Sequence, residues 1–282
     1  METYQAPNGK PYRNWQAVFD DAQPLPQGGT MYTITIDSNR CKKDGLCARV
    51  CPKGIFVQRE KLTIPELMNE DGCIACGHCV AICPQDAICH SEFPSTEIRT
   101  IQVEEMPTEE QVMTLLKTRR SIRAFRDKPL ARETIERIID GARFAPSGHN
   151  SQSTQYLVVQ DRTVLNQVSA MVIEYLKFEI RRFANPLFRT LALLADRELA
   201  ESGLHEVPNF KRVTRLFESG ADPILYGAPV LLAFHARRTD GFADINAQLA
   251  LQNASFVAHS LGIGHFYTGW VVSTWRAPMA CS

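Results

Sequence analysis

The sequence predicts an α+β fold in two parts, a small cysteine-rich module followed by a larger domain. Seven of the nine cysteines lie between residues 41 and 83, in two runs that each end in Cys-Pro. After residue 107, apolar residues mostly follow the spacing of helices, with only a few short apolar runs that are typical of strands. A chain of 282 residues is long enough for about two domains.

The loop at residues 71–87 reads DGCIACGHCVAICPQDA and organises the cysteine-rich module. Its four cysteines follow the spacing C-x2-C-x2-C-x3-C-P, the run that bacterial-type ferredoxins use to hold a [4Fe–4S] cluster. In that arrangement three thiolates converge on one cluster and the fourth ligates a second one. The loop therefore predicts a partner motif elsewhere in the chain.

The partner motif lies 32 residues upstream, with one difference: Asp44 stands where the later copy has Cys76. Two clusters with crossed ligation are expected. One would take Cys51, Cys73, Cys76 and Cys79. The other would take Cys41, Cys47 and Cys83, with its fourth iron held by Asp44, held by water, or missing. Paired C-x2-C motifs also bind zinc, but seven cysteines in two crossed motifs favour iron–sulfur clusters.

The composition is that of an ordinary globular protein, with 44% hydrophobic and 22% charged residues. The formal net charge is zero, which gives no indication of a nucleic-acid partner. No apolar run approaches the roughly 18 residues of a membrane-spanning helix, and the first residues lack the pattern of a signal peptide. Because thiolate ligands need a reducing environment, a cytoplasmic location is expected.

Short elements are expected to frame the cysteine motifs. Residues 1–30, rich in Pro, Gly, Gln and Asn, are interpreted as an N-terminal extension. Residues 31–37 alternate as a strand does, residues 54–64 form a hairpin between the motifs, and residues 87–90 form a closing strand. The resulting two-cluster module, at residues 31–93, has a small apolar core, so its clusters must hold it together.

A connector at residues 94–107 leads into the larger domain at residues 108–282. Thr108 is the predicted N-cap of its first helix, and Arg132 to Ala145 has the spacing of a second, amphipathic helix. The later elements are expected in the order of a loop at 146–152, a strand at 155–160, a helix at 163–178, a mostly helical region at 179–222, a buried strand within 230–236, a long helix at 241–261 and a last strand or loop at 265–272.

A basic segment follows the first helix of the larger domain. Arg119, Arg120 and Arg123 place three guanidinium groups within five residues, and these forks suit phosphate oxygens. Ser121 can add a hydroxyl group to such a site. Taken alone, the segment has an ordinary alternative, since a basic run is often only a solvated surface.

A polar loop at residues 145–152 reads APSGHNSQ and is the second candidate. Its small residues would let backbone amides approach a ligand. The amides of Asn150 and Gln152 offer both donors and acceptors, which match the edge of a flavin ring. Taken alone, this stretch is equally typical of a polar turn.

Together and in this order, the stretches resemble the FMN-dependent nitroreductase family. The match is carried by RRSIRAF at 119–125, APSGHNSQ at 145–152, GAPVLLAF at 227–234 and NAQLALQNASFVAHSLGIG at 246–264, and it covers roughly residues 107–272. With the front module, the chain is similar to the iron–sulfur nitroreductases, in which a two-cluster ferredoxin domain precedes the flavin domain. This resemblance implies a nitroreductase-like α+β domain, a homodimer, and FMN bound between the subunits.

The resemblance also implies roles for individual residues. The FMN phosphate and ribityl chain would be held by Arg119, Arg120, Ser121 and Arg123. The flavin ring would lie along Pro146, Ser147, Asn150 and Gln152. Thr268 and Gly269 fall where the family has a backbone segment beside the reactive flavin nitrogen. Family members usually continue with another strand and a C-terminal arm, and this sequence is expected to lack that arm or to replace it.

The expected function is a flavin- and iron–sulfur-dependent oxidoreductase. Electrons from reduced ferredoxin or NAD(P)H would pass through the clusters to FMN and on to a nitroaromatic, a quinone or an activated alkene. No side-chain nucleophile or general acid stands out, so flavin-based chemistry without a catalytic side chain is expected. No GxGxxG fingerprint follows a strand, so no separate nicotinamide domain is expected. The alternative is a ferredoxin-like electron-transfer protein with a degenerate flavin site.

Overall fold

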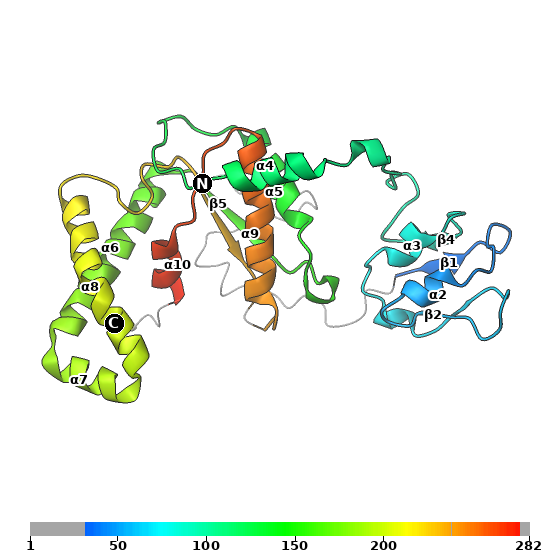
Figure 1. The fold of residues 1–282 in the computed structure, drawn as a ribbon, viewed down its shortest axis with the longest axis horizontal. Coiled ribbons are helices and arrows are strands. Elements are labelled where there is room, and N and C mark those ends of the chain that lie inside the picture. Colours follow the sequence, from blue (N-terminus) through cyan, green and yellow to red (C-terminus); the bar gives the residue numbers. More distant parts are fainter. Residues whose placement is uncertain (1–31, 238, 277–282) are drawn as a thin grey trace.

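The computed structural model describes residues 32–237 and 239–276, and it confirms the α+β fold class (Figure 1). The predicted extension at residues 1–30 and the end of the chain at 277–282 lie outside the described residues. A front module with short strands, blue and cyan in Figure 1, precedes a larger part in which helices pack on a two-stranded sheet. Within the described ranges, no helix has the length and apolarity needed to cross a membrane.

The front module consists of two antiparallel strand pairs and two short helices. β1 (Ile34–Ile36) pairs with β4 (Ile88–His90), which confirms the predicted first and closing strands. β2 (Phe56–Val57) pairs with β3 (Glu66–Leu67), so the predicted hairpin exists but ends later than residue 64. The helical elements are α2 (Leu46–Val50), η1 (Glu70–Gly72) and α3 (His78–Ile82).

The core of this module is small and includes the cysteines themselves. Ile34, Ile55, Phe56, Val80 and Ile88 are buried together with Cys47 and Cys79. Five large apolar side chains supply little hydrophobic stabilisation for a module of this size. The structure is therefore consistent with a module that depends on bound metal for its stability.

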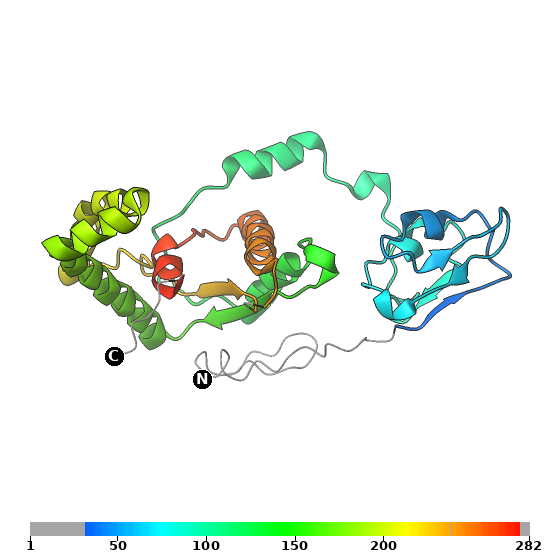
Figure 2. The same ribbon diagram turned by 90° about the horizontal axis from the view of Figure 1, so that it is seen from below.

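The connector contains η2 (Val103–Glu105) and ends at α4 (Glu109–Thr118), which together run from the front module to the larger part (Figure 2). Thr108 caps α4 as predicted. Its hydroxyl accepts the Gln111 backbone N–H at 3.2 Å, and its own N–H donates to the Gln111 side chain at 2.9 Å. This reciprocal capping box satisfies two N–H groups that the start of a helix otherwise leaves without partners.

The centre of the larger part is a sheet of β5 (Gln155–Val159) and β6 (Leu231–His235), paired antiparallel from Gln155–His235 to Val159–Leu231. Two helices, α5 (Arg132–Arg143) and α9 (Ala243–Ser260), pack on each other beside it (Figure 1). Small residues allow this close approach, because a Cβ added to Gly141 would lie 2.3 Å from Val257 Cγ2. The predicted helices and strands in this region are confirmed.

A helical extension is formed by α6 (Arg162–Ala184), α7 (Pro186–Ala195) and α8 (Arg197–Glu218), as predicted for residues 163–178 and 179–222. The prediction of a last strand or loop at 265–272 is wrong in part. His265 forms a single parallel bridge with Ser121, but α10 (Gly269–Arg276) is a helix. It is helical because Val271 and Thr274, one turn apart, are buried, and Val271 packs in the core of α6 and α8.

Candidate functional site

Two cavities in the front module bring the cysteines together in the two crossed sets. The first, here named the Cys76 cavity, is lined by Cys51, Cys73, Cys76, Cys79 and His90, among others. The second, named the Asp44 cavity, is lined by Cys41, Asp44, Cys47 and Cys83, among others. In each cavity one cysteine comes from the other copy of the repeat, which is the exchange that crossed ligation requires.

The two copies of the repeat present the same backbone donors to their sulfurs. Each set of bonds recurs at the offset of 32 residues: Lys43 N–H to Cys41 Sγ (3.4 Å) and Ala75 N–H to Cys73 Sγ (3.4 Å); Ile55 N–H to Cys51 Sγ (3.3 Å) and Ala87 N–H to Cys83 Sγ (3.2 Å). Gly45 and Gly77 immediately precede α2 and α3 with φ of 69° and 72°, a left-handed conformation that suits glycine. N–H donors around a sulfur favour its thiolate form.

Asp44 occupies the place that Cys76 occupies in the other copy. Its side chain lines the Asp44 cavity, and its Oδ1 accepts the backbone N–H of Leu46 at 3.1 Å. A carboxylate that accepts an N–H near the start of α2 also has an ordinary structural role, since it satisfies a donor at the helix start. The geometry thus gives Asp44 a local partner as well as a position facing the cavity.

Burial changes the protonation of the enclosed thiols. It raises the pKa of Cys79 to about 11, and it also raises the pKa values of Cys47 and Cys73, because a thiolate is poorly solvated there. Iron binds the thiolate, so a positively charged iron core would displace these protons. Each cavity therefore presents cysteine sulfurs from both copies of the repeat, together with backbone N–H groups that donate to them. This set of donors fits an iron–sulfur cluster.

His90 is a residue of the Cys76 cavity that the sequence did not single out. It is 5% exposed, and its Nε2 lies 3.5 Å from Cys73 Sγ. Burial lowers its pKa. The alternation of β4, in which the side chains of Ile88 and His90 are buried and Cys89 is exposed, is the signal that could have placed it.

The basic segment lies where α4 ends. Arg119 is half-buried with its guanidinium 5.9 Å from the Tyr267 ring centre, and Arg123 lies 5.9 Å from the ring centres of Tyr226 and Phe266. Arg120 donates back to the carbonyls at the end of α4. Across the described residues, no carboxylate forms an ion pair with these three guanidinium groups, which suits a site for a phosphate.

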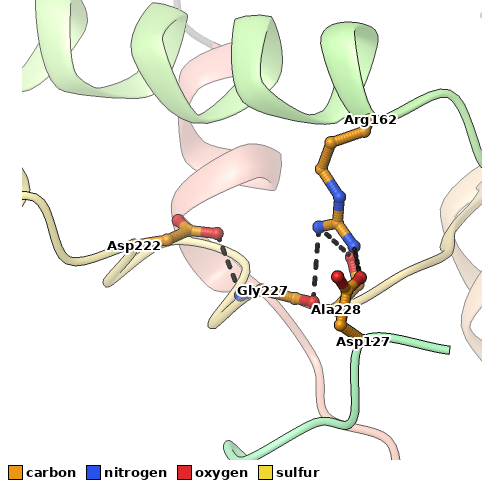
Figure 3. Close-up of polar contacts among 5 residues, drawn as sticks. All are labelled: Asp127, Arg162, Asp222, Gly227 and Ala228. Carbon is orange, nitrogen blue, oxygen red and sulfur yellow. Dashed lines mark hydrogen bonds and ion pairs between the residues drawn. The ribbon is translucent and has the colours of Figure 1, made fainter.

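The turn before β6 is fastened to the end of the basic segment (Figure 3). Arg162, the first residue of α6, donates to the carbonyls of Gly227 and Ala228 at 3.3 Å and to Asp127 at 3.2 Å. Asp222 accepts the N–H of Gly227 at 3.1 Å. These contacts fix the two residues that follow Tyr226, whose ring lies 5.9 Å from the Arg123 guanidinium.

The polar loop has a strained backbone. His149, Asn150 and Gln152 have φ of 54°, 53° and 46°, in the left-handed region that non-glycine residues seldom adopt. Such conformations persist only where the surroundings hold them, and they cluster at functional sites. Asn246, on α9 and only 2% exposed, provides this hold: its Oδ1 accepts the Gly148 N–H at 3.0 Å.

The Nδ2 of Asn246 extends the network to the far side of the loop. It donates to Ser151 Oγ at 3.3 Å, Ser153 Oγ at 3.2 Å and Asp240 Oδ2 at 3.3 Å. Ser153 also donates to Asp240, and this bond is the main reason why the pKa of Asp240 is lowered. The sequence did not single out Asn246 or Asp240, because their role depends on contacts between distant segments.

Asn150 connects the polar loop to the front module. Its Nδ2 donates to the carbonyl oxygens of Ile74 at 3.0 Å and Ala75 at 2.8 Å. Ile74 and Ala75 are the two residues between Cys73 and Cys76. A predicted flavin contact is therefore bonded directly to the loop that lines the Cys76 cavity.

The two predicted flavin stretches contact opposite ends of α9. The polar loop bonds to Asn246 near the start of α9, whereas Thr118 bonds to His259 near its end, and Ser121 pairs with His265 beyond it. Position 259 is thirteen steps along α9 from position 246, which amounts to about 20 Å at ~1.5 Å per residue.

Two family models match the chain. The model described as "Nitroreductase family" matches residues 116–272, more than half of the chain. The chain belongs to the nitroreductase family. The model described as "4Fe-4S dicluster domain" matches residues 33–84, so the nitroreductase domain is preceded by a 4Fe-4S dicluster domain, as predicted.

Curated relatives match the two parts separately. The FMN reductase (NAD(P)H) of Bacillus subtilis is 28% identical over 154 residues, which are 55% of this chain and 52% of that protein. The 7Fe ferredoxin of Hydrogenibacillus schlegelii is 38% identical over 55 residues, which are 20% of this chain and 67% of that protein. The chain spans 34% and 66% of the length of two further relatives, described as NADH dehydrogenase/NAD(P)H nitroreductase.

Solved structures also resemble this member of the nitroreductase family. A nitroreductase with bound FMN from Desulfitobacterium hafniense has a TM-score of 0.42 and 23% sequence identity, and the match covers 61% of this chain and 77% of that one. Within the nitroreductase domain, Thr268 donates to the Ile224 carbonyl at 3.4 Å, and Gly269 is the first residue of α10. Both therefore lie beside the segment at residues 224–226, which ends at Tyr226, the residue that faces Arg123. They do not lie beside the polar loop.

Proposed function

We propose that this nitroreductase-family protein is an oxidoreductase that passes electrons from reduced ferredoxin or NAD(P)H, by way of iron–sulfur clusters and FMN, to a nitroaromatic, a quinone or an activated alkene. The clusters supply one-electron transfer, and FMN supplies the conversion between one- and two-electron chemistry. The observation that carries the proposal is the pair of bonds from Asn150 to Ile74 and Ala75, since they join a predicted flavin loop to a cluster loop.

The lining of the two cavities supports the assignment of cluster ligands. The cluster in the Cys76 cavity would be held by Cys51, Cys73, Cys76 and Cys79. The cluster in the Asp44 cavity would be held by Cys41, Cys47 and Cys83, with a fourth iron on Asp44 or water, or with three irons. The likeness to a 7Fe ferredoxin favours a three-iron cluster in the Asp44 cavity, since seven irons correspond to one three-iron and one four-iron cluster.

The separation along α9 supports an FMN site shared between two copies of the chain. One copy would hold the phosphate and ribityl chain through Arg119, Arg120, Ser121 and Arg123. The other copy would line the ring with Pro146, Ser147, Asn150 and Gln152. Thr268 and Gly269 would belong with the phosphate side, because they lie beside the segment leading to Tyr226.

Exposed apolar side chains on two helices support the second copy as well. α4 and α9 contact each other and leave large apolar residues exposed: Val112, Met113, Leu116, Ile245 and Leu249. Large apolar side chains exposed on a helix are more typical of a protein interface than of a free surface. A homodimer that covers α4 and α9 would bury these side chains.

Anaerobic purification with iron, sulfide and flavin counted per chain tests the proposal. We expect seven or eight irons and one FMN per chain and a dimer by analytical ultracentrifugation. The flavin should be reduced when reduced ferredoxin or NAD(P)H is added alone, and reoxidised when a nitroaromatic is then added. The rate of flavin reduction with each compound identifies whether reduced ferredoxin or NAD(P)H is the electron donor. Clusters without flavin in every fresh preparation would instead support the alternative, an electron-transfer protein with a degenerate flavin site.

A further inference from the structure

We propose that His90 donates a hydrogen bond to the Cys73 sulfur and thereby raises the reduction potential of the cluster in the Cys76 cavity. This inference rests on the proposed binding of a cluster by Cys73. It concerns the cluster whose loop is bonded to Asn150, and therefore the one nearest to the predicted flavin loop.

The direction of the bond follows from the contacts of the two ring nitrogens. His90 Nδ1 accepts the backbone N–H of Glu92 at 3.1 Å, so Nδ1 cannot itself carry the proton. The proton of the neutral ring is then on Nε2, which lies 3.5 Å from Cys73 Sγ. His90 is therefore a donor to the sulfur and not an acceptor.

The imidazole is held in this orientation from both sides. Its ring centre lies 5.3 Å from that of Tyr32 and 5.0 Å from that of Phe93. The His90 backbone pairs with Ile34 across the sheet and accepts the N–H of Phe93 at 2.9 Å. A buried ring with these constraints keeps its donor aimed at Cys73 at little further cost in conformational entropy.

Comparison of the two copies of the repeat shows that a histidine donor occurs at the Cys76 cavity and has no counterpart at the equivalent position of the other copy. The backbone N–H···S bonds are common to both copies, so they cannot distinguish the two clusters. At the offset of 32 residues, the position of His90 corresponds to Gln58. The Gln58 amide donates to the carbonyl oxygens of Lys43 and Thr63, at 3.0 and 2.7 Å, instead of to a sulfur.

The electrostatic consequence has a definite sign. A cluster gains negative charge when it is reduced, and part of that charge resides on its cysteine sulfurs. A donor aimed at Cys73 Sγ therefore stabilises the reduced form more than the oxidised form, as hydrogen bonds to cluster sulfurs do. The bond therefore makes the cluster in the Cys76 cavity easier to reduce than the same cluster would be without this donor.

The test is a redox titration of the full-length holoprotein followed by EPR, with His90→Phe compared with wild type. Phenylalanine keeps an aromatic ring between Tyr32 and Phe93 but has no donor. At the potential that half-reduces the wild-type cluster, we expect the reduced-to-oxidised ratio to fall about tenfold, which corresponds to a shift of ~59 mV to more negative potential for one electron. His205→Phe is the matched control, because His205 is exposed on α8 and lines neither cavity; the potential of the cluster should not change in this variant.

An unchanged potential in His90→Phe, with the cluster intact, would overturn the inference while leaving the proposed function standing. Should this variant fail to assemble its clusters, pulsed EPR of wild-type protein with ¹⁵N-labelled histidine gives the answer directly. A weak coupling from a histidine nitrogen to the reduced cluster supports the bond, and its absence refutes it. Wild-type protein that contains no iron would remove the proposed function and this inference together.

Discussion

Replacing Asn150 by aspartate would separate the front module from the polar loop with almost no change in shape. Aspartate has the same size as asparagine and also tolerates the left-handed backbone that this position adopts, with φ of 53°. It has no N–H to donate, so both bonds to the carbonyls of Ile74 and Ala75 are lost. A carboxylate oxygen would instead face two carbonyl oxygens, which adds repulsion.

The magnitude follows from the two lost bonds. At ~0.5–1.5 kcal/mol each, they contribute about 1–3 kcal/mol to docking of the module on the loop. That corresponds to a decrease of about 5- to 150-fold in the ratio of docked to undocked molecules. Small-angle X-ray scattering would record undocking as an increase in the radius of gyration, and anaerobic stopped-flow spectroscopy would record slower flavin reduction from the clusters.

A matched control is available at Asn185. Its side chain caps α7 by accepting the N–H groups of Leu187 and Phe188, which aspartate does equally well, so Asn185→Asp should change neither measurement. The reasoning would be refuted if Asn150→Asp gave the scattering profile and the flavin reduction rate of the wild type. In that case the contact between the loops would contribute nothing to the coupling of the two parts.

Three further predictions concern other parts of the chain. Asp44→Cys should add one iron per chain and make the EPR signals of the two clusters alike; an unchanged iron count and spectrum would remove Asp44 from the ligand position. Burial raises the pKa of Glu179, which the guanidinium of Arg182 at 3.1 Å offsets only in part, so the folded state binds this proton more tightly than the unfolded chain and stability falls as pH rises through the raised pKa. Thermal unfolding followed upward from the ordinary glutamate pKa of about 4.3 should show this contribution in wild type and not in Glu179→Gln. Gly141→Ala should destabilise the wild type by about 1–3 kcal/mol in urea unfolding, because the added methyl group meets Val257, but should stabilise a Val257→Ala background by up to ~1 kcal/mol.

Local patterns in the sequence were sufficient for much of the fold. The cap at Thr108 and the buried face of Ile135, Ile138 and Ala142 depend on neighbours within one or two helical turns, and the structure confirms them. The repeat at an offset of 32 residues is also readable, since its spacing alone pairs Cys51 with the later motif. The structure places that cysteine in the cavity of the later motif.

Other features depend on contacts between segments far apart in the chain. α10 was missed because Val271 becomes a core residue only when α6 and α8 are in place. His90 and Asn246 act on groups 17 and 98 residues away, so no local window contains both partners. The bond from Asn150 to Ala75 spans 75 residues and joins two parts of the chain that the sequence presents as separate.

The position of the two polar stretches at opposite ends of α9 has a consequence for mixed assemblies. In a flavin pocket shared as proposed, the chain that lines the ring also provides the contact with the cluster loop through Asn150. Its neighbour only binds the phosphate. In that arrangement, a chain without clusters and a chain without the arginines would each be inactive alone. Co-expressed, they would restore one working pocket of the two, so that complementation between subunits, rather than within them, becomes the genetic signature of this architecture.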